Sequence, residues 1–360
     1  MQTMSQVELK RVYKAYGTTV ALHEVDLRIE EGEFLTLLGP SGCGKTTTLR
    51  LIAGFIEPTR GTILLGNKDV TRLPPHRREI GMVFQDYALF PHMTVRDNIG
   101  FGLKERGAGR SEIERRAAEL LELIRLPHIA LRYPSELSGG QAQRVSFARA
   151  IAHPPKVLLM DEPLGALDLK LRETMQLELR RLQQALKITT VFVTHDQGEA
   201  MSMSDRIAVM NQGRIEQIGT AEDIYREPCN RFVAGFVGQI NLIEGKVSAT
   251  DAGYASLVTK QSQLIHVQDP NHTPAGSLRA VAIRPEKMRL HNGTAPHDAV
   301  NTLEGRVVAR SFAGNSVKLV VDVGEERPLV IEDRPSALEA AVGEKVRVGW
   351  SADDGRLLDN

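Results

Sequence analysis

A disulfide framework and an excess of one charge are both missing from this sequence. Its two cysteines, Cys43 and Cys229, are far apart and suggest no pairing, as a reducing compartment would permit. Lysine plus arginine total 45, and aspartate plus glutamate also total 45. The chain therefore lacks the basic excess that usually accompanies nucleic-acid binding, although a local basic patch stays open.

Long hydrophobic runs are missing as well. Nowhere do about 18 apolar residues follow one another, so no segment is expected to span a bilayer. Residues 1–8 lack the basic start and apolar stretch of a signal peptide, and none is expected. We expect a chain that is cytosolic, or held at a membrane only by its partners.

The order of segments predicts two domains, the first of them α/β. A chain of 360 residues exceeds one ordinary core, and its first two-thirds alternates strand-like and helix-like stretches. The apolar runs Val157–Met160 and Thr190–Val193 suit strands buried on both faces of a parallel sheet. The amphipathic stretch Ser111–Ile124 predicts a helix with Ser111 as N-cap and Glu114 completing a capping box. Further strands are expected at Val7–Tyr13, Ala21–Ile29, Phe34–Leu38 and Ile80–Phe84, and further helices at Lys45–Ala53, Ala142–Ala152 and Leu167–Leu186.

The last third of the chain has a different texture. Short strand-like runs are separated there by glycine, proline, asparagine and aspartate, which predicts a small β-barrel or paired β-modules. We place the boundary near Phe236–Gln239, which gives domains at residues 1–238 and 239–360. The expected strands are Glu244–Val247, Leu278–Ile283, Gly305–Ala309, Ser316–Val323 and Lys345–Trp350.

A glycine-rich loop between an expected strand and an expected helix predicts a phosphate-binding site. It fits the GxxxxGK[ST] pattern at every fixed position and reads Gly39-Pro40-Ser41-Gly42-Cys43-Gly44-Lys45-Thr46, followed by Thr47. Glycines let successive N–H groups wrap around one anion, and the helix start adds its positive dipole end. Lys45 supplies a charge for the β- and γ-phosphates, and the Thr46 hydroxyl suits a Mg²⁺ ligand. Cys43 fills a variable position, where we expect a small filler.

The loop alone leaves GTPases, kinases and ATPases open. A GTPase is expected to carry an Asn-Lys-x-Asp guanine reader. The stretch Asn67-Lys68-Asp69-Val70 comes near this pattern but lacks the final aspartate, which weighs against guanine.

Five further segments, in a fixed order, decide the family. They are Gln85 after a strand, Leu137-Ser138-Gly139-Gly140-Gln141 before a helix, Val157–Glu162 ending in two acids, Leu164-Gly165-Ala166-Leu167-Asp168, and His195 after a strand. With the phosphate loop, over about residues 7–235, they resemble the ATPases of ABC transporters: Walker A, Q-loop, signature, Walker B, D-loop and H-loop. The resemblance implies a P-loop NTPase fold with a helical subdomain at about residues 90–152.

The chemistry of these positions agrees with ATP hydrolysis assisted by Mg²⁺. Asp161 at a strand end can help to hold the cation, since hard cations prefer carboxylate oxygen, and Glu162 is the candidate general base for the attacking water. By resemblance, His195 contacts the γ-phosphate, and Gln85 senses Mg²⁺ and the water and links the site to the membrane partner. Tyr16 matches the aromatic residue that stacks on adenine in this family.

The signature predicts a second anion site and a homodimer. Ser138, Gly139 and Gly140, with Gln141 after them, place small residues and N–H groups at a helix start. The family implies that this start faces the γ-phosphate held by Lys45 of a second subunit. One chain has one loop and one signature, so a head-to-tail dimer is expected, with Asp168 at its seam.

Among ABC ATPases the importer class is favoured. Too few residues separate the loop from the signature for the long coiled coil of chromosome-maintenance relatives, and translation-associated relatives carry two cassettes per chain. The stretch Tyr87–Val95 resembles the surface that receives a coupling helix of the membrane subunits. The resemblance implies two integral membrane permease subunits, a periplasmic solute-binding protein, and a peripheral location at the cytoplasmic face of the inner membrane.

The tail supports the same class. Ile283–Glu286 and Gly305–Ser316 resemble the OB-like TOBE domain of importer ATPases. OB folds can bind oligonucleotides, but Tyr254 and Trp350 are the tail's only tyrosine and tryptophan and form no obvious stacking platform. No nucleic-acid partner is expected.

The solute is the least determined prediction. The stretches Glu162–Arg172 and Phe236–Asn241 look most like the spermidine/putrescine group of importers. Importers of sugars, iron(III), sulfate or phosphonate have similar ATPases, and an ABC ATPase of DNA repair or translation is the more distant alternative. A repair role would predict DNA-stimulated hydrolysis without membrane partners.

Overall fold

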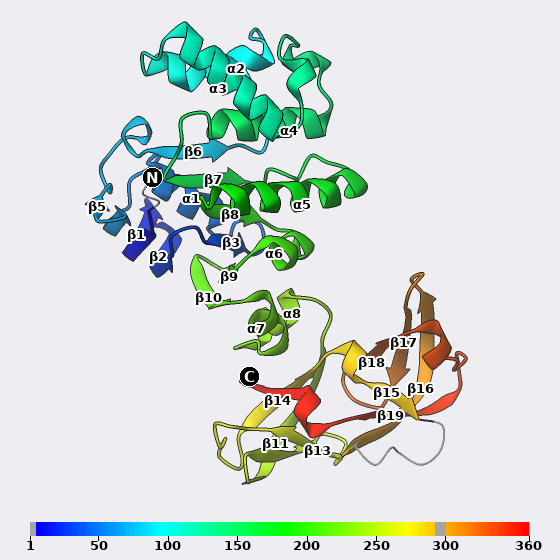
Figure 1. Cartoon of the computed structure of the whole chain (residues 1–360). Helices are drawn as coiled ribbons and strands as arrows, with labels where there is room; N and C mark the ends of the chain where they lie inside the picture. The colour runs from blue at the N-terminus through cyan, green and yellow to red at the C-terminus, as the bar shows by residue number, and fades with distance from the viewer. Residues whose placement is uncertain (1–4, 292–299, 360) are drawn as a thin grey trace. The chain divides into compact units, whose positions relative to one another are not determined.

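The computed structural model describes residues 5–291 and 300–359 (Figure 1). Contacts group the chain into two compact units, Met1–Ala221 and Glu222–Asn360. Helix α8 (Arg231–Phe236) falls in the second unit, because the buried Arg284 guanidinium donates to the carbonyls of Ala234, Val237 and Gln239. The domain boundary that the sequence places near residue 238 stays a prediction.

The first unit is organised by a six-stranded sheet in the order β10-β9-β3-β8-β7-β6. Its strands β6, β7, β8, β3 and β9 are parallel, and β10 pairs antiparallel with β9. All residues of β3 and β8 are buried, as expected for strands covered on both faces. These strands confirm the α/β fold. Their bounds are β3 Phe34–Leu38, β6 Ile80–Val83, β7 Val157–Asp161, β8 Thr189–Thr194, β9 Arg206–Asn211 and β10 Arg214–Gly219.

A second, antiparallel sheet in the order β2-β1-β4-β5 shares one hydrophobic core with α1 and one face of the central sheet. The other face of the central sheet packs with α2 to α5, and Figure 1 shows α2, α3 and α4 together at one end of this unit. The bounds are β1 Val7–Tyr16, β2 Thr19–Ile29, α1 Lys45–Ala53, β4 Arg60–Leu65, β5 Lys68–Asp69, α2 Val95–Glu105, α3 Arg110–Leu123, α4 Gly139–Ala150, α5 Leu169–Leu186 and α6 Gln197–Met203. Helix α7 (Ala221–Arg226) begins at the last residue of this unit and otherwise belongs to the second. In the described part of the chain, no helix is long and apolar enough to cross a membrane.

The expected capping box at Ser111 is wrong. Helix α3 begins one residue earlier, at Arg110, with Gly109 as its N-cap and no side-chain cap. The Glu114 carboxylate, which would have closed the box, instead accepts from Arg110 at 2.9 Å. An ion pair four residues apart has replaced the cap.

After α7 and α8, the second unit forms two five-stranded antiparallel sheets, β13-β12-β11-β14-β20 and β15-β19-β16-β17-β18, around one core. Two buried asparagines join the sheets. Asn241 at the start of β11 exchanges two hydrogen bonds with the backbone of Val330, and Asn301 at the start of β16 does the same with His266. The all-β tail is confirmed. Its strands are β11 Asn241–Asp251, β12 Tyr254–Thr259, β13 Leu264–Gln268, β14 Leu278–Ile283, β15 Arg289–His291, β16 Asn301–Phe312, β17 Val317–Asp322, β18 Leu329–Asp333, β19 Lys345–Trp350 and β20 Gly355–Asp359.

Candidate functional site

The glycine-rich loop joins the buried strand β3 to the start of α1. Gly44, the N-cap of α1, has φ 106° and no side-chain cap, a left-handed backbone that glycine adopts without steric cost. A Cβ added at Gly39 would lie 2.3 Å from the Met210 carbonyl oxygen and 2.6 Å from Cys43 Sγ. Gly39 is therefore required because backbone and core leave no room for a side chain, whereas Gly42 and Gly44 are required for their left-handed backbone, with φ 78° and 106°.

Lys45 is the charged centre of this loop. Its side chain is buried, and its Nζ donates to the carbonyls of Gly39 at 2.7 Å and Pro40 at 3.0 Å. The ammonium thus lies inside the curve of the loop, where the pattern predicts a phosphate. Ser41 and Gly42 are exposed at the tip, and Thr46 and Thr47 are half-buried at the helix start. Cys43 packs in the core, and burial raises the pKa of its thiol.

Thr46 and Asp161 form the candidate cation site. Asp161 is the last residue of β7, and its Oδ1 accepts from the Thr46 hydroxyl at 3.2 Å. Burial raises the pKa of this carboxyl, and Thr46, Arg50 and Lys45 oppose the shift. A hydroxyl beside one carboxylate suits Mg²⁺, which proteins usually hold through one or two such groups together with substrate phosphates. Gln85 is exposed after β6, and a methyl group added at Gly165 would lie 3.8 Å from its Nε2.

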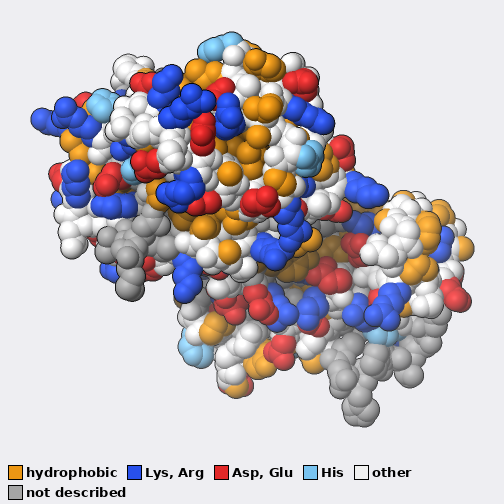
Figure 2. All heavy atoms as spheres, turned by 45° about the horizontal axis from the view of Figure 1, so that its top comes forward, with side chains coloured by type: hydrophobic (Ala, Val, Ile, Leu, Met, Phe, Trp, Pro, Cys, Tyr) orange, Lys and Arg blue, Asp and Glu red, His pale blue; other side chains and the backbone are white. Residues whose placement is uncertain are grey.

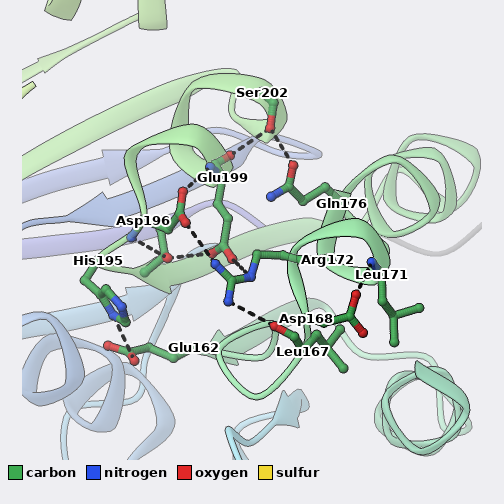
Figure 3. A network of polar contacts seen from close by, with 11 residues as sticks. Glu162, Leu167, Asp168, Leu171, Arg172, Gln176, His195, Asp196, Glu199 and Ser202 are labelled. Atoms are coloured by element: carbon green, nitrogen blue, oxygen red, sulfur yellow. Dashed lines mark hydrogen bonds and ion pairs between the residues drawn. The ribbon is translucent and has the colours of Figure 1, made fainter. Parts of the chain in front are cut away.

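Glu162 and His195 meet because their strands are neighbours. Strands β7 and β8 are parallel, with Asp161 opposite Val193, so the residues that follow both strands lie at the same edge of the sheet. Glu162 Oε2 lies 3.1 Å from His195 Nδ1 (Figure 3). The backbone of Glu162 has φ 42° and is held by the Val193 carbonyl, which accepts from its N–H at 3.0 Å. Such left-handed backbone at a non-glycine residue is uncommon and clusters at functional sites.

The signature forms the start of α4, which begins at Gly139, earlier than the sequence indicates. Ser138 is the N-cap: its Oγ accepts from Gln141 N at 3.4 Å, and its N–H donates to Gln141 Oε1 at 3.0 Å. Ser138 and Gly139 are exposed, whereas Gly140 is buried. A Cβ added at Gly140 would lie 3.0 Å from Leu171 Cδ1, so this helix start packs closely on the first turn of α5.

Asp168 and Tyr16 both lie at the surface. Asp168 is the N-cap of α5 and accepts from Leu171 N at 3.0 Å. Tyr16 ends β1 with about half of its surface exposed, and the Lys14 ammonium lies 4.8 Å from its ring centroid. Both positions are accessible to a second molecule or a nucleotide base.

The structure adds three residues that the sequence analysis does not single out. Arg172 in the first turn of α5 contacts Asp196, the neighbour of His195 in the chain, and lies near Glu199 (Figure 3). One sequence signal was available, because Asp196 followed three residues later by Glu199 is the pattern of an acidic helix start. Asp196 is in fact the N-cap of α6.

Comparisons with known proteins match both parts of the chain. A family model described as ABC transporter matches residues 22–165, and one described as TOBE domain matches residues 281–358. A protein of Acidothermus cellulolyticus is 48% identical over 98% of this chain and 92% of its own length. Relatives from Nostoc sp. and Thermobifida fusca are 49% and 45% identical, over 88% and 99% of this chain and 84% and 94% of their own lengths. All three are named spermidine/putrescine import ATP-binding protein PotA.

Two solved structures also resemble the chain. The dimeric structure of a bacterial ABC transporter cassette is 36% identical, with a TM-score of 0.54, over 60% of this chain and 98% of the cassette. A dimeric post-hydrolysis state of that cassette, bound to ADP and phosphate, has the same identity and the same coverage, with a TM-score of 0.53.

Proposed function

The chain belongs to the family of ABC transporter ATP-binding proteins, and on this premise we propose that it is the ATP-hydrolysing subunit of a polyamine importer. The observation that carries the hydrolytic part is the convergence at one sheet edge. There the Lys45 loop, the Thr46–Asp161 pair and the Glu162–His195 pair follow three neighbouring strands. The polyamine part rests on relatives that are named as spermidine/putrescine import proteins and that this chain matches over nearly their whole length.

The residues of this edge divide the work of hydrolysis among them. Lys45 and the loop N–H groups bind the phosphates, and Tyr16 stacks on the base. Thr46 and Asp161 would hold Mg²⁺, which neutralises charge on the β- and γ-phosphates when bound, and Gln85 is proposed as a further ligand. Glu162 takes the proton of the attacking water. An ionised carboxylate can only accept, so His195 Nδ1 is the donor in its 3.1 Å contact with Glu162, and the histidine thereby holds the base in place.

The second half of each site comes from a second copy of the chain. Ser138, Gly139 and Gly140 offer a helix start at which Ser138 and Gly139 are exposed, and α5, which begins with the largely exposed Leu169, packs next to it. The solved cassettes that resemble this chain are dimeric. We infer a head-to-tail homodimer in which the signature of one chain meets the γ-phosphate on Lys45 of the other, with Asp168 at the seam.

The stretch Tyr87–Val95 is the proposed docking surface for the membrane subunits. Figure 2 shows hydrophobic side chains gathered on the side of the first unit that carries α2–α4. Hydrogen bonds tie the backbone there to α4 and α2: Arg149 of α4 donates to the Ala88 carbonyl at 2.5 Å, and Asn98 of α2 donates to the carbonyls of Phe90 and Met93. A displacement of this surface by a bound partner would therefore be transmitted to α4, the helix that begins with the signature. The proposed partners are two permease subunits and a periplasmic solute-binding protein, with the chain at the cytoplasmic face of the inner membrane.

Reconstitution tests the proposal. The chain would be incorporated into proteoliposomes with candidate permeases, and the binding protein and one solute would be enclosed in the vesicles. ATP hydrolysis would then be measured with spermidine, putrescine, maltose, iron(III), sulfate or a phosphonate as that solute. We expect stimulation by the two polyamines, with Glu162→Gln as the inactive control. Stimulation by another solute alone would move the chain to that class of importer, and stimulation by DNA without membrane partners would contradict the transport function.

A further inference from the structure

We propose that Arg172 is a positioning residue that fixes the D-loop and the histidine segment Thr194–Asp196 to each other. The inference rests on the proposed function, because it concerns residues on either side of the proposed hydrolytic site. Figure 3 shows the arrangement: the Arg172 guanidinium lies between the segment that ends in Leu167 and Asp168 and the segment that carries His195.

Arg172 holds the D-loop through the backbone. Its Nη2 donates to the Leu167 carbonyl at 3.0 Å, one residue before Asp168. Its own N–H donates to the Asp168 carbonyl at 2.8 Å within the first turn of α5. The side chain of Arg172 therefore fixes the D-loop at Leu167, the residue that leads directly into Asp168.

The same guanidinium holds the histidine segment through Asp196. Nη1 donates to Asp196 Oδ2 at 3.2 Å, while Oδ1 of Asp196 accepts from Glu199 N at 3.0 Å. The Thr194 hydroxyl accepts from Asp196 N at 3.0 Å and donates to Glu199 Oε2 at 2.5 Å. His195 thus lies between Thr194 and Asp196, whose side chains are both fixed by hydrogen bonds.

The charges explain why an arginine is needed here. Glu199 is buried, and burial raises the pKa of its carboxyl. Asp196 adds a second acid nearby, and Arg172 Nε lies 3.9 Å from Glu199 Oε1. Only a planar fork with several N–H groups can serve a carbonyl on one side and a carboxylate on the other at once, whereas a lysine ammonium is a single point charge.

The consequence is a connection between the two sites of the proposed dimer. Asp168 lies at the proposed seam, where it meets the partner, whereas His195 contacts Glu162 in the chain's own site. A displacement of the seam is passed through Leu167 and Arg172 to Asp196, and so to the histidine that holds the general base. We therefore expect Arg172 to affect the rate of hydrolysis and its cooperativity, not the affinity for nucleotide.

Three single variants of the whole chain test this role. Arg172→Gln removes the charge and the fork, and Arg172→Lys keeps the charge without the fork. Arg180→Gln is the matched control: Arg180 lies on the same helix, eight residues after Arg172, is similarly shielded, and pairs with Asp205 instead of Asp196. For each variant, kcat, the KM for ATP, the Hill coefficient, nucleotide affinity and Tm are measured.

For Arg172→Gln we expect kcat to fall about 10-fold or more, since small misplacements of catalytic groups are costly. Nucleotide affinity should stay within about twofold of the parent, because the Lys45 loop is untouched, and the Hill coefficient should fall toward 1. Arg172→Lys should keep the parental Tm yet show a reduced kcat. Arg180→Gln should match the parent in all three kinetic quantities.

A double-variant cycle with Asp196→Asn gives a second readout. Asparagine keeps the N-cap of α6 but removes the charge, so a network effect predicts that Arg172→Gln adds little to the loss already caused by Asp196→Asn. Fully additive losses, an Arg172→Gln kcat equal to that of Arg180→Gln, or affinity falling in step with kcat would each overturn the proposal. If the parental chain itself hydrolyses no ATP, the proposed function fails instead.

Discussion

Two helix starts, those of α1 and α4, are assigned to the same triphosphate, and they are built differently. The start of α1 has Gly44 as its cap, no side-chain cap, and the buried Lys45 folded over the loop. It rests on β3, all of whose residues are buried. The start of α4 is capped by the chain's own Ser138 and Gln141, and Ser138 and Gly139 are exposed there.

This difference separates binding from catalysis. An uncapped helix start with a cation beside it can bind phosphate without help from a partner, so α1 is complete within one chain. The start of α4 has part of its hydrogen bonding satisfied internally and carries no cation in its first turn. It can contribute to the phosphate only when a second chain brings one to it. One subunit should therefore bind ATP, and two should be needed to hydrolyse it.

The largest expected effect leaves both helix starts intact. Glu162→Gln removes the general base while a glutamine can still accept from His195, so we expect hydrolysis to slow by on the order of 10²–10⁴-fold with unchanged ATP affinity. The ATP-loaded variant should then accumulate as a dimer. Single-turnover phosphate release and light scattering on a sizing column measure the two effects. A turnover near the parental rate would show that Glu162 is not the base.

Removal of the Lys45 ammonium should impair ATP binding, which is the role assigned to the start of α1 and not to that of α4. Lys45→Ala removes the charge inside the loop, and we expect ATP affinity to fall about 100-fold, roughly two charge-assisted hydrogen bonds. Titration calorimetry on the monomer measures it. Lys156→Ala, which breaks only the surface ion pair with Glu79, is the control and should leave affinity unchanged. Unaltered binding in Lys45→Ala would refute the assignment of the loop.

The start of α4 should behave in the opposite way. Ser138→Asp keeps a good N-cap but places a negative charge where the partner's γ-phosphate is expected. We expect parental ATP affinity in the monomer, no ATP-dependent dimer, and hydrolysis reduced about 10- to 100-fold, since like charges in close contact cost a few kcal/mol. Ser138→Asn, a neutral cap, is the matched control and should stay near the parental rate. A fall in monomer affinity would place the signature in the chain's own site.

Mixing the two defective chains sharpens the same prediction. In a head-to-tail dimer, the intact loop of Ser138→Asp meets the intact signature of Lys45→Ala, so each mixed dimer regains one complete site. Statistical pairing allows recovery of up to about a quarter of parental hydrolysis. Each variant alone should stay nearly inactive. No recovery on mixing, with both chains folded, would contradict sites shared between subunits.

The sequence predicts the parts of the site better than their contacts. The strands β3, β7 and β8 are recognisable because continuous apolar runs suit a sheet buried on both faces. The sequence does not predict β12, β13, β18 and β20, because short half-exposed strands carry little pattern. The order of Glu162 and His195 is visible in the sequence, but their 3.1 Å contact depends on the register of β7 against β8.

Residues that act through a network are the hardest to predict. Arg172 reads as an ordinary polar position of an amphipathic helix, and nothing near it in sequence points to Asp196, 24 residues away. The capping box at Ser111 is wrong for the opposite reason: α3 begins at Arg110, so Ser111 lies inside the first turn, and Glu114 accepts from Arg110 instead. Local sequence patterns thus predict whether a segment is a helix or a strand. The hydrogen-bond or ion-pair partner that a side chain takes depends on the residues that the fold brings next to it.

The smallest expected effect concerns the base, which neither helix start contacts. Tyr16 is about half exposed at the end of β1, and its ring is proposed to stack on adenine. Tyr16→Ala should lower ATP affinity on the order of 10-fold, within the 1–3 kcal/mol that such stacking contributes, and Tyr16→Phe should leave it unchanged because the ring is kept. Since stacking does not read the edges of a base, GTP affinity should fall by the same factor. Equal affinity in the alanine variant, or a loss confined to ATP, would show that the base is bound by other groups. The predicted result would mean that the base is bound by Tyr16, outside both helix starts, so that α1 and α4 differ only in how they bind phosphate.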